Sequence, residues 1–392
     1  MRLCWTALFA SAIVAMACAE TTTTQPEPRS DASLTGDALV ESNRCTVRDI
    51  AAAEHHGCAL GTGGAVFCWG SNRLGELGAT RTTSGIPIQV ALPQPASQIS
   101  AGRSRACARL IDGSVYCWGR APDSNDAAPV VQPPTLVALP GNAADMGAGG
   151  AHLCALTASG GVYCSGLASS VGDGLNKAQA QPALLSELSK MHSVRMLAVG
   201  LFHTCALTRA DAILCWGSDP DILAPNTGFP PVPTVVDSIG AGVSRITAGP
   251  NRTCVIHNDK TVSCLPALSI ATVGALGRDN SAVGPGERHT CVLKTGGTVA
   301  CFGDNAVGQL GNDSDISPPE GSIQTVRLPD KATRLAVGHA HACAVLNDQS
   351  VWCWGRGTEE QLGQGGTQTS FLPIRVALPE TCTAVPVKTL TP

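Results

Sequence analysis

The stretch His56–Gly70 reads HGCALGTGGAVFCWG and contains two apolar arms, each with a central cysteine. The arms, His56–Leu60 and Val66–Gly70, are separated by five residues made up mainly of glycine with threonine and alanine. Glycine and small polar residues between two apolar arms are typical of a β-hairpin turn. The stretch therefore predicts two antiparallel strands whose cysteines lie ten positions apart.

The same cysteine pair recurs along the chain, and a recurrence at regular spacing indicates a repeat architecture. It occurs seven times, at 58/68, 107/117, 154/164, 205/215, 254/264, 291/301 and 343/353. Of the 18 cysteines, only Cys4, Cys18, Cys45 and Cys382 lie outside these pairs. Gly (43) and Pro (26) are abundant and charged residues make up only 14%, which favours short strands and turns over long helices.

The hairpin register can be tested within the sequence. If the two cysteines face each other, the positions two residues further in also face each other, and in six units both are apolar: Leu60/Val66, Leu156/Val162, Leu207/Ile213, Ile256/Val262, Leu293/Val299 and Val345/Val351. Only Arg109/Val115 departs. Positions two residues further out pair a large side chain with glycine, as in His56/Gly70, and Arg252/Pro266 is the exception. This register places the cysteines of each unit where a disulfide is feasible. Metal binding is the alternative, but zinc-ligand cysteines usually lie two to four residues apart.

Several further elements recur in a fixed order around these hairpins. They are a Gly five residues before the first Cys, the His-x-Cys-Ala-Leu and Val-x-Cys-Trp-Gly arms, and an Asn-x-x-Gly-x-Leu-Gly box at Asn72–Gly78 and Asn305–Gly311, with a weaker copy at Gln361–Gly363. A Val-Ala-Leu-Pro strand follows at residues 90–93, 137–140 and 376–379. Together these elements resemble the regulator of chromosome condensation repeat over residues 45–382. Units three, four and five are degenerate, with Ser165, an absent box and Leu265-Pro266 respectively.

In that family each repeat forms a four-stranded blade, and seven blades close into a ring without exposed sheet edges. The resemblance therefore implies an all-β, seven-bladed β-propeller closed by the N- and C-terminal strands, with one disulfide per blade. The expected pairs are Cys58–Cys68, Cys107–Cys117, Cys154–Cys164, Cys205–Cys215, Cys254–Cys264, Cys291–Cys301 and Cys343–Cys353. The last Val-Ala-Leu-Pro strand leads only to Cys382, and Cys45 enters the first unit with nothing before it, so ring closure predicts a Cys45–Cys382 disulfide.

The N-terminus predicts export. Residues 1–17 carry an early Arg2 and an apolar stretch from Leu3 to Ala17, which is typical of a signal peptide and too short for a membrane span. Cys18 after Ala15-Met16-Ala17 resembles a bacterial lipobox, so Cys18 is the expected site of lipid attachment, although Ala15 departs from the usual residue there. We expect an exported bacterial protein that is lipid-anchored in the cell envelope, with simple secretion or a periplasmic location as the alternative. Residues 18–44 are predicted to be a disordered tether, and 383–392 a C-terminal tail.

Two repeated side chains could suggest chemistry. The histidines His56, His152, His203, His289 and His341 recur at one position, so we interpret them as packing residues of the repeat, with metal or proton chemistry as the alternative. The tryptophans Trp69, Trp118, Trp216 and Trp354 lie on the face opposite to the cysteines. We expect them to pack between blades, with a ligand cage as the alternative.

The sequence carries no Gly-x-Ser-x-Gly elbow, phosphate-binding loop or His-Glu-x-x-His motif. The acidic run Asn312–Asp315 lacks the glycine and distal glutamate of a calcium loop. We therefore predict that the protein is not an enzyme and has neither cofactor nor metal. A net charge of −4 and 4% aromatic residues argue against nucleic-acid binding.

These features favour a monomeric, non-catalytic scaffold of the cell envelope that binds another envelope or extracellular protein and contacts the membrane only through its lipid anchor. Loops carry recognition on rigid scaffolds, and the segments that vary most between units are 71–88, 120–135, 166–182, 217–233 and 304–323. The family includes a nucleotide exchange factor for a small GTPase, a role that export excludes, and an inhibitor of β-lactamases, which export permits. A carbohydrate or cell-wall binding module is the alternative, and a hydrolase or lyase with a site at the propeller channel is a weaker one.

Overall fold

The computed structural model describes residues 45–79, 83–121, 131–175, 177–186, 188, 193–217 and 232–382. The predicted signal peptide, the lipid site at Cys18, the tether and the C-terminal tail lie outside these residues. So do parts of four of the five predicted recognition loops.

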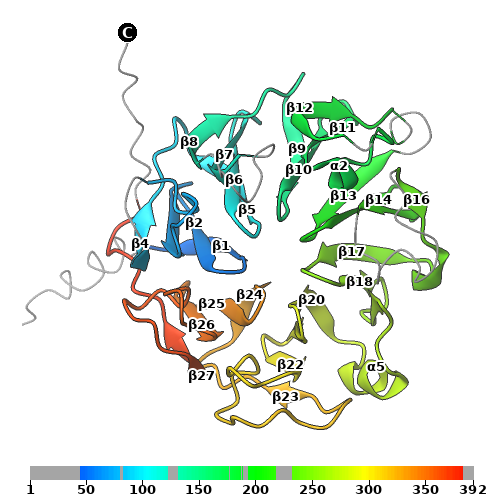
Figure 1. Cartoon of the computed structure of the whole chain (residues 1–392). Helices are drawn as coiled ribbons and strands as arrows, with labels where there is room; N and C mark the ends of the chain where they lie inside the picture. Colours follow the sequence, from blue (N-terminus) through cyan, green and yellow to red (C-terminus); the bar gives the residue numbers. More distant parts are fainter. Residues whose placement is uncertain are drawn as a thin grey trace, which may run out of the picture. The chain divides into compact units, whose positions relative to one another are not determined.

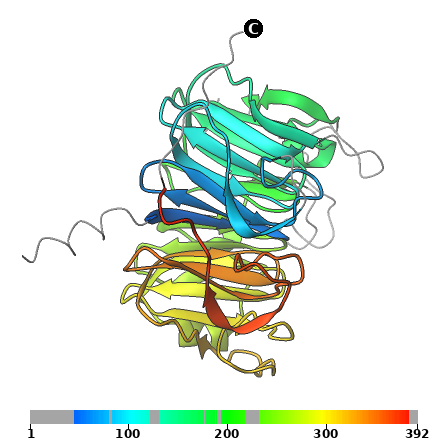
Figure 2. The same cartoon turned by 90° about the vertical axis from the view of Figure 1, so that its left-hand side faces the viewer.

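Seven antiparallel sheets follow one another along the chain and are arranged as blades around a common centre (Figure 1). Figure 2 shows the same ring turned by 90°, with the blades seen from the side. Each sheet is built from consecutive strands, ordered from the centre outwards. Blade 1 consists of β1 (Val47–Ala52), β2 (His56–Gly61), β3 (Val66–Gly70) and β4 (Ser84–Gln89). Blade 2 consists of β5 (Ala96–Ala101), β6 (Arg105–Leu110), β7 (Val115–Arg120) and β8 (Val131–Leu136). Blade 3 consists of β9 (Ala143–Ala148), β10 (His152–Thr157), β11 (Val162–Gly166), α2 (Ala168–Val171) and β12 (Gln179–Leu184).

The remaining four blades complete the ring. Blade 4 consists of β13 (Val194–Val199), β14 (His203–Thr208), β15 (Ile213–Gly217) and β16 (Thr234–Val235), followed by η2 (Asp237–Ile239). Blade 5 consists of β17 (Val243–Ala248), β18 (Thr253–His257) and β19 (Val262–Leu265), followed by α5 (Ile270–Leu276). Blade 6 consists of β20 (Asn280–Pro285), β21 (His289–Lys294), β22 (Val299–Gly303) and β23 (Gln324–Thr325), and blade 7 of β24 (Ala332–Val337), β25 (His341–Leu346), β26 (Val351–Gly355) and β27 (Ser370–Arg375). The predicted seven-bladed, all-β propeller is confirmed.

All eight predicted disulfides are present. In every blade the two cysteines are direct partners across the second and third strands, with Cα atoms 4.0–4.2 Å apart. Cys45 and Cys382 form the eighth bond, with Cα atoms 4.4 Å apart, where blade 1 meets blade 7. At this junction Val47 and Trp69 of blade 1 share an apolar core with Val345 of blade 7. The ring is thus closed by packing and by a covalent link between the first and last residues that the structure describes.

The predicted pairing of histidine with glycine is also confirmed, and the close approach of two backbones explains it. Gly217 lies opposite His203 in the ladder of blade 4 and has a φ of 127°, a conformation that favours glycine. A Cβ atom at this position would collide with the carbonyl oxygen of Phe202, so no larger residue fits without backbone movement.

Blade 5 corrects the expectation of four strands in every repeat, because its sheet contains only β17, β18 and β19. Pro266 follows β19 directly and offers no backbone N–H to a sheet ladder. The Ser269 side chain then accepts a hydrogen bond from the backbone N–H of Thr272, which starts helix α5. Leu276 of this helix is 1% exposed and packs into the same apolar core as Val262, so the helix replaces the outer strand as cover for the blade.

The tryptophans pack between blades, as predicted. All four are at most 1% exposed. On the opposite face of the same strands, the disulfides contact the following blade; for example, Cys58 and Cys68 share a core with Ile99 of blade 2. Blades 1, 2, 4 and 7 therefore present a disulfide to one neighbour and a tryptophan ring to the other. In blade 3 the short helix α2 takes the place that the box has in blades 1 and 6. Trp216 of blade 4 packs against Gly172, which directly follows this helix.

Candidate functional site

The turns between the first and second strands of all seven blades lie around one mouth of the central channel. Each turn is closed by a backbone hydrogen bond over three residues, as from the N–H of Gly338 to the carbonyl of His341, 2.9 Å. The second residue of each turn, which follows the residue whose N–H donates this bond, varies from blade to blade. In chain order these residues are Glu54, Arg103, Gly150, Leu201, Pro250, Glu287 and His339, which we call the mouth ring. Six of them line one cavity, and Glu287 joins them through its contacts with His339.

The long loops after the third strands begin on the same side of the ring. Their first residues are hydrogen-bonded to the mouth turns: the N–H of Ser71 donates to the carbonyl of His55 at 2.9 Å, and that of Asp304 to the carbonyl of Arg288 at 2.9 Å. The predicted recognition segments 71–88 and 304–323 therefore start beside the mouth, as do the described beginnings of 120–135 and 166–182 through Arg120 and Leu167. We call the surface formed by the mouth turns and these loops the mouth face.

One side of the mouth ring is charged. The Glu54 carboxylate lies 2.6 Å from Arg103 Nε and 3.2 Å from His55 Nε2, and Glu287 lies 3.2 Å from His339 Nδ1. Burial acts to raise the pKa of Glu54, but the His55 hydrogen bond and the charges of its neighbours leave that pKa below its usual value. Burial lowers the pKa of His339 against the opposing effect of Glu287 and Glu54. At neutral pH this side therefore presents the ionised carboxylate of Glu54 beside Arg103.

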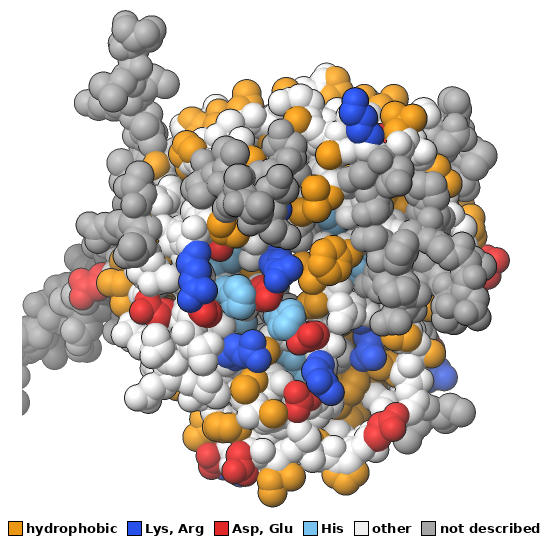
Figure 3. Space-filling model, in the orientation of Figure 1, with side chains coloured by type: hydrophobic (Ala, Val, Ile, Leu, Met, Phe, Trp, Pro, Cys, Tyr) orange, Lys and Arg blue, Asp and Glu red, His pale blue; other side chains and the backbone are white. Residues whose placement is uncertain are grey.

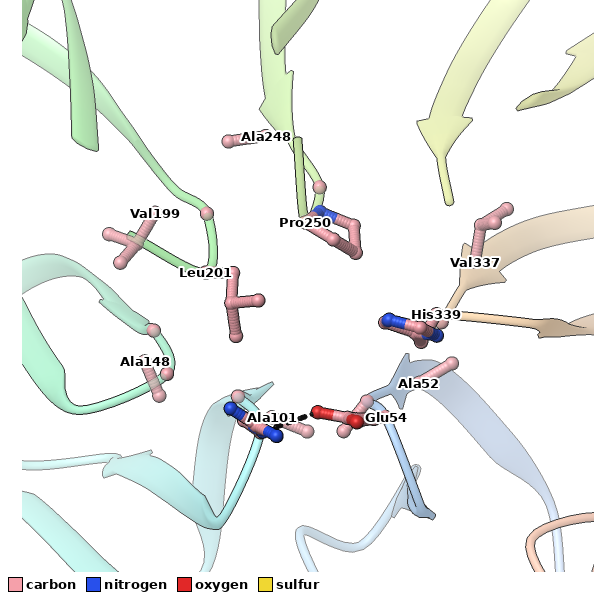
Figure 4. Close-up of a pocket in the computed structure, with 18 residues that line it drawn as sticks. Ala52, Glu54, Ala101, Ala148, Val199, Leu201, Ala248, Pro250, Val337 and His339 are labelled. Carbon is pink, nitrogen blue, oxygen red and sulfur yellow. Dashed lines mark ion pairs between the residues drawn. The ribbon is translucent and has the colours of Figure 1, made fainter. Parts of the chain in front are cut away.

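The other side of the mouth ring is apolar. Figure 4 shows Leu201 and Pro250 across the opening from Glu54 and His339, with the ion pair of Glu54 drawn as a dashed line. Next to Leu201, the Phe202 side chain is 38% exposed. Two backbone bonds hold this side together: Gly150 N–H donates to the carbonyl of Leu201 at 2.8 Å, and Leu201 N–H to that of Gly249 at 3.4 Å. In Figure 3 charged and histidine side chains gather around the centre of this face, with hydrophobic ones beside them.

The cavity inside the mouth ring is small. Its volume is about 70 Å³, whereas pockets for small ligands range from about 300 to 1,000 Å³. The ring therefore offers a surface with a charged half and an apolar half rather than a deep substrate pocket. Among the residues that the structure describes, no three His, Cys, Asp or Glu side chains lie close enough to hold a metal ion.

The five repeated histidines lie deeper than the mouth ring, and all are at most 2% exposed. His152 Nε2 lies 2.9 Å from Thr204 Oγ1 of the next blade, and His203 Nε2 lies 2.8 Å from Thr253 Oγ1. Burial lowers the pKa of His56, His152 and His341 to about 3 and that of His289 to about 4. These positions support the packing interpretation, because His56, His152, His289 and His341 are neutral at physiological pH and because His152 and His203 bridge neighbouring blades.

Reasoning from the sequence did not identify the mouth ring, although the sequence shows that its members occupy one position of the repeat. Each member lies four residues before the first cysteine of its blade, at a place where the frame is fixed and the residue type changes. A comparison of the seven copies at that one position shows the change from charged to apolar residues. What the copies alone do not show is that the seven positions meet around one opening.

Two family models match the sequence. A model of the regulator of chromosome condensation (RCC1) repeat matches residues 63–108 and 348–388. A second model of the same repeat matches residues 47–76, 96–125, 282–309 and 332–361. The degenerate blades 3, 4 and 5 lie almost entirely outside these matches. No curated protein matches the sequence.

Solved structures show the same architecture. Prp20p from Saccharomyces cerevisiae is 16% identical, with a TM-score of 0.70 over 88% of this chain and 89% of that one. The ectodomain of the receptor kinase ACR4 from Arabidopsis thaliana is 19% identical, with a TM-score of 0.52 over 86% of this chain and 100% of that one. Human WBSCR16 is 17% identical, with a TM-score of 0.50 over 86% of this chain and 82% of that one. At these identities the likeness concerns the fold.

No helix among the described residues is long and apolar enough to cross a membrane. The matched repeats, the seven blades and the structural relatives agree with one another. The matched segments of the chain are regulator of chromosome condensation repeats, and the chain folds as a seven-bladed β-propeller like its structural relatives.

Proposed function

We propose that the protein is a non-catalytic scaffold of the cell envelope that binds another protein through its mouth face. The observation that carries this proposal is the position of the variable residues. The mouth ring and the long loops differ from blade to blade, yet they lie together on one side of a rigid ring. Variable residues on a rigid frame are the usual arrangement of a recognition surface.

The character of the surface supports a protein partner. Propellers of this repeat family are common protein-binding scaffolds, and the similar propeller Prp20p binds Gsp1p and histones. A shallow surface with a charged half beside an apolar half suits the mixed chemistry of protein interfaces. Carbohydrate recognition would favour several exposed aromatic rings. Among the described residues, Phe202 is the only phenylalanine or tryptophan that is exposed.

The covalent chemistry supports a location outside the cytosol. Eight disulfides form and persist in an oxidising compartment outside the cytosol. With the signal peptide predicted at residues 1–17, this supports an exported protein. Lipid attachment at Cys18 would leave the propeller on a tether of about 25 residues, long enough for the mouth face to reach a partner beside the membrane.

The test compares two exposed apolar residues on opposite sides of the ring. Phe202 lies on the mouth face, whereas Ile111, 65% exposed, lies in the β6–β7 hairpin at the other end of the strands. We expect Phe202→Asp to abolish capture of the partner from an envelope extract, while Ile111→Asp retains it and neither variant changes the melting temperature. Equal capture by both variants, or equal loss in both, would show that recognition does not use this face.

A further inference from the structure

The junction between blades 5 and 6 lacks three elements that recur at other junctions. At the blade 1–2 junction, Trp118 packs on the box of the preceding blade, near Gly78, and fills the space between the two sheets. At the blade 5–6 junction the position of Trp118 is taken by Phe302, and the box is replaced by residues 267–269 and the first turn of α5. The position of the repeated histidine is taken by Arg252.

These replacements leave a cavity of about 440 Å³ that opens beside Gly303 and Asp304, where the loop after β22 leaves the mouth face. Leu268 and Phe302 form part of its apolar wall, and Pro318 and Pro319 form another part. This volume lies within the range of about 300–1,000 Å³ that is typical of ligand pockets. It is several times that of the cavity inside the mouth ring, which is about 70 Å³.

Two guanidinium groups line this cavity without an ion pair. Arg252 makes one long hydrogen bond, 3.4 Å from its Nη1 to Thr290 Oγ1 of the next blade. The Arg288 guanidinium has no hydrogen-bond or salt-bridge partner among the residues that the structure describes. An arginine offers five N–H donors, so most of the donors of this pair are available to a ligand.

Asp304, one of the two acidic residues of the lining, feels the charge of Arg288 but is already engaged in hydrogen bonds. Asp304 accepts hydrogen bonds from the N–H of Ala306 at 3.1 Å, from Ser317 Oγ at 2.9 Å and from Gln309 Nε2 at 3.3 Å. These bonds hold it within the loop that follows β22. The second acidic residue of the wall, Glu320, is exposed. Within the described part of the chain, neither carboxylate forms a salt bridge with Arg252 or Arg288.

Partial burial makes the unpaired charge of Arg252 unfavourable. Desolvation lowers the pKa of this guanidinium, which nevertheless stays protonated at neutral pH. A charge-assisted, bidentate hydrogen bond to an anion would offset the desolvation. The two arginines are balanced by Asp304 and Glu320, so the lining has no net charge and favours a monoanion over a phosphate dianion.

We propose that the cavity between blades 5 and 6 binds a carboxylate carried on an apolar body, with Arg252 and Arg288 holding the carboxylate and Phe302 contacting the apolar part. The volume suits one or two amino-acid residues. Two sources share this chemistry, the C-terminal residue of a polypeptide and a free aromatic or aliphatic acid. This site goes beyond the proposed partner recognition and does not depend on it.

The test measures binding of defined probes to the exported chain by calorimetry. The probes are N-acetyl-Gly-Phe with a free carboxylate, the same dipeptide as its amide, and phenylacetate. We expect the acid to bind at least about tenfold more tightly than the amide, the effect of one charge-assisted contact. Tighter binding of the dipeptide acid than of phenylacetate would identify a polypeptide terminus as the ligand, and equal binding would identify a free acid.

Variants locate the binding. Arg252→Gln and Arg288→Gln should each weaken binding of the acid by about tenfold or more. Arg327→Gln, which removes an exposed arginine of blade 6 that pairs with Asp313, should have no effect. Phe302→Trp should fill the cavity with the ring that other junctions contain and abolish binding while the domain stays folded. Equal affinity for acid and amide, or binding that persists in all these variants, would overturn the proposal. Because the probes are pure, either result is independent of partner capture at Phe202.

Discussion

The indole Nε1 of Trp118 donates a hydrogen bond of 2.8 Å to the main-chain carbonyl of Glu76, across the boundary between blades 1 and 2. The same bond joins Trp354 to Gln309 at 2.9 Å, and Trp69 to Gln361 at 2.9 Å. In each case the acceptor lies in the box of the preceding blade. The recurring box and the recurring tryptophan are therefore two halves of one contact between neighbouring blades.

The first prediction concerns this contact. Trp118→Phe should lower the free energy of unfolding by about 2 kcal/mol, because it leaves the buried Glu76 carbonyl without its donor and removes part of a buried ring. The matched control is Trp352→Phe, since Trp352 is only partly buried and donates within its own hairpin to Ser350 Oγ. Urea denaturation of both variants checks the prediction. A loss as large in the control would mean that the bond across the boundary is not the cause.

The second prediction concerns acid stability. In the folded state the pKa of His152 is lowered to about 3, whereas its ordinary value is 6.5. As the pH falls below 6.5, the unfolded chain binds a proton that the folded chain does not, so the free energy of unfolding decreases as the pH falls. Between pH 7.5 and 5.5 each such histidine should lower it by about 1.4 kcal/mol. His56 and His341 have the same direction and size of shift.

Two variants separate titration from packing. His152→Gln should reduce the loss of stability between pH 7.5 and 5.5 by the contribution of one histidine, about 1.4 kcal/mol. Thr204→Val removes the hydroxyl that meets His152 but adds no titrating group. It should therefore lower stability by a similar amount at both pH values. If His152→Gln retains the full pH dependence, the buried histidine is not the group that binds the proton on unfolding.

The hairpin register could be predicted because its test lies within the sequence. Cys58 and Cys68 face each other only if Leu60 faces Val66 and His56 faces Gly70, and all of these pairs exist. Blade 5 could not be predicted to lack its outer strand. Local signals at Pro266 and Ser269 indicate a break and a helix start, but whether α5 can replace the strand depends on Leu276 reaching a core that is shared with blade 6.

The candidate site was predictable only in part. Segments such as 304–323 could be chosen because their length and composition vary. The mouth ring could not, because Glu54 and Leu201 are far apart in the sequence and meet only once the ring has closed. The cavity at Arg252 is also a property of the assembled junction. It arises from three replacements in two different blades, each of which appears alone as ordinary degeneration of the repeat.

The third prediction concerns the N-terminus. Cys18 follows Ala15-Met16-Ala17 in a context that resembles a lipobox. Cells that express the full chain should therefore incorporate labelled palmitate into the protein, and Cys18→Ala should abolish the label. The variant should instead appear as a soluble exported protein. A wild-type chain that takes up no label would show that Cys18 is not lipidated and would support simple secretion.

The last prediction concerns the ring closure. Cys45 and Cys382 are half-buried, whereas every blade cysteine is at most 5% exposed, so a mild reductant should reach the closing disulfide first. Alkylation and peptide mapping after partial reduction should find label on Cys45 and Cys382 before any blade cysteine.

The Cys45–Cys382 bond spans 337 positions, whereas each blade bond spans 10. In the chain-entropy account its loss costs up to about 5–6 kcal/mol, against about 3 kcal/mol for a blade bond. The double variant Cys45→Ser/Cys382→Ser should therefore melt at a lower temperature than the wild type and keep its seven blade disulfides. Label that first appears on blade cysteines would show that the blades open before the ring does, and a double variant as stable as the wild type would show that packing of blade 1 on blade 7 is sufficient for closure.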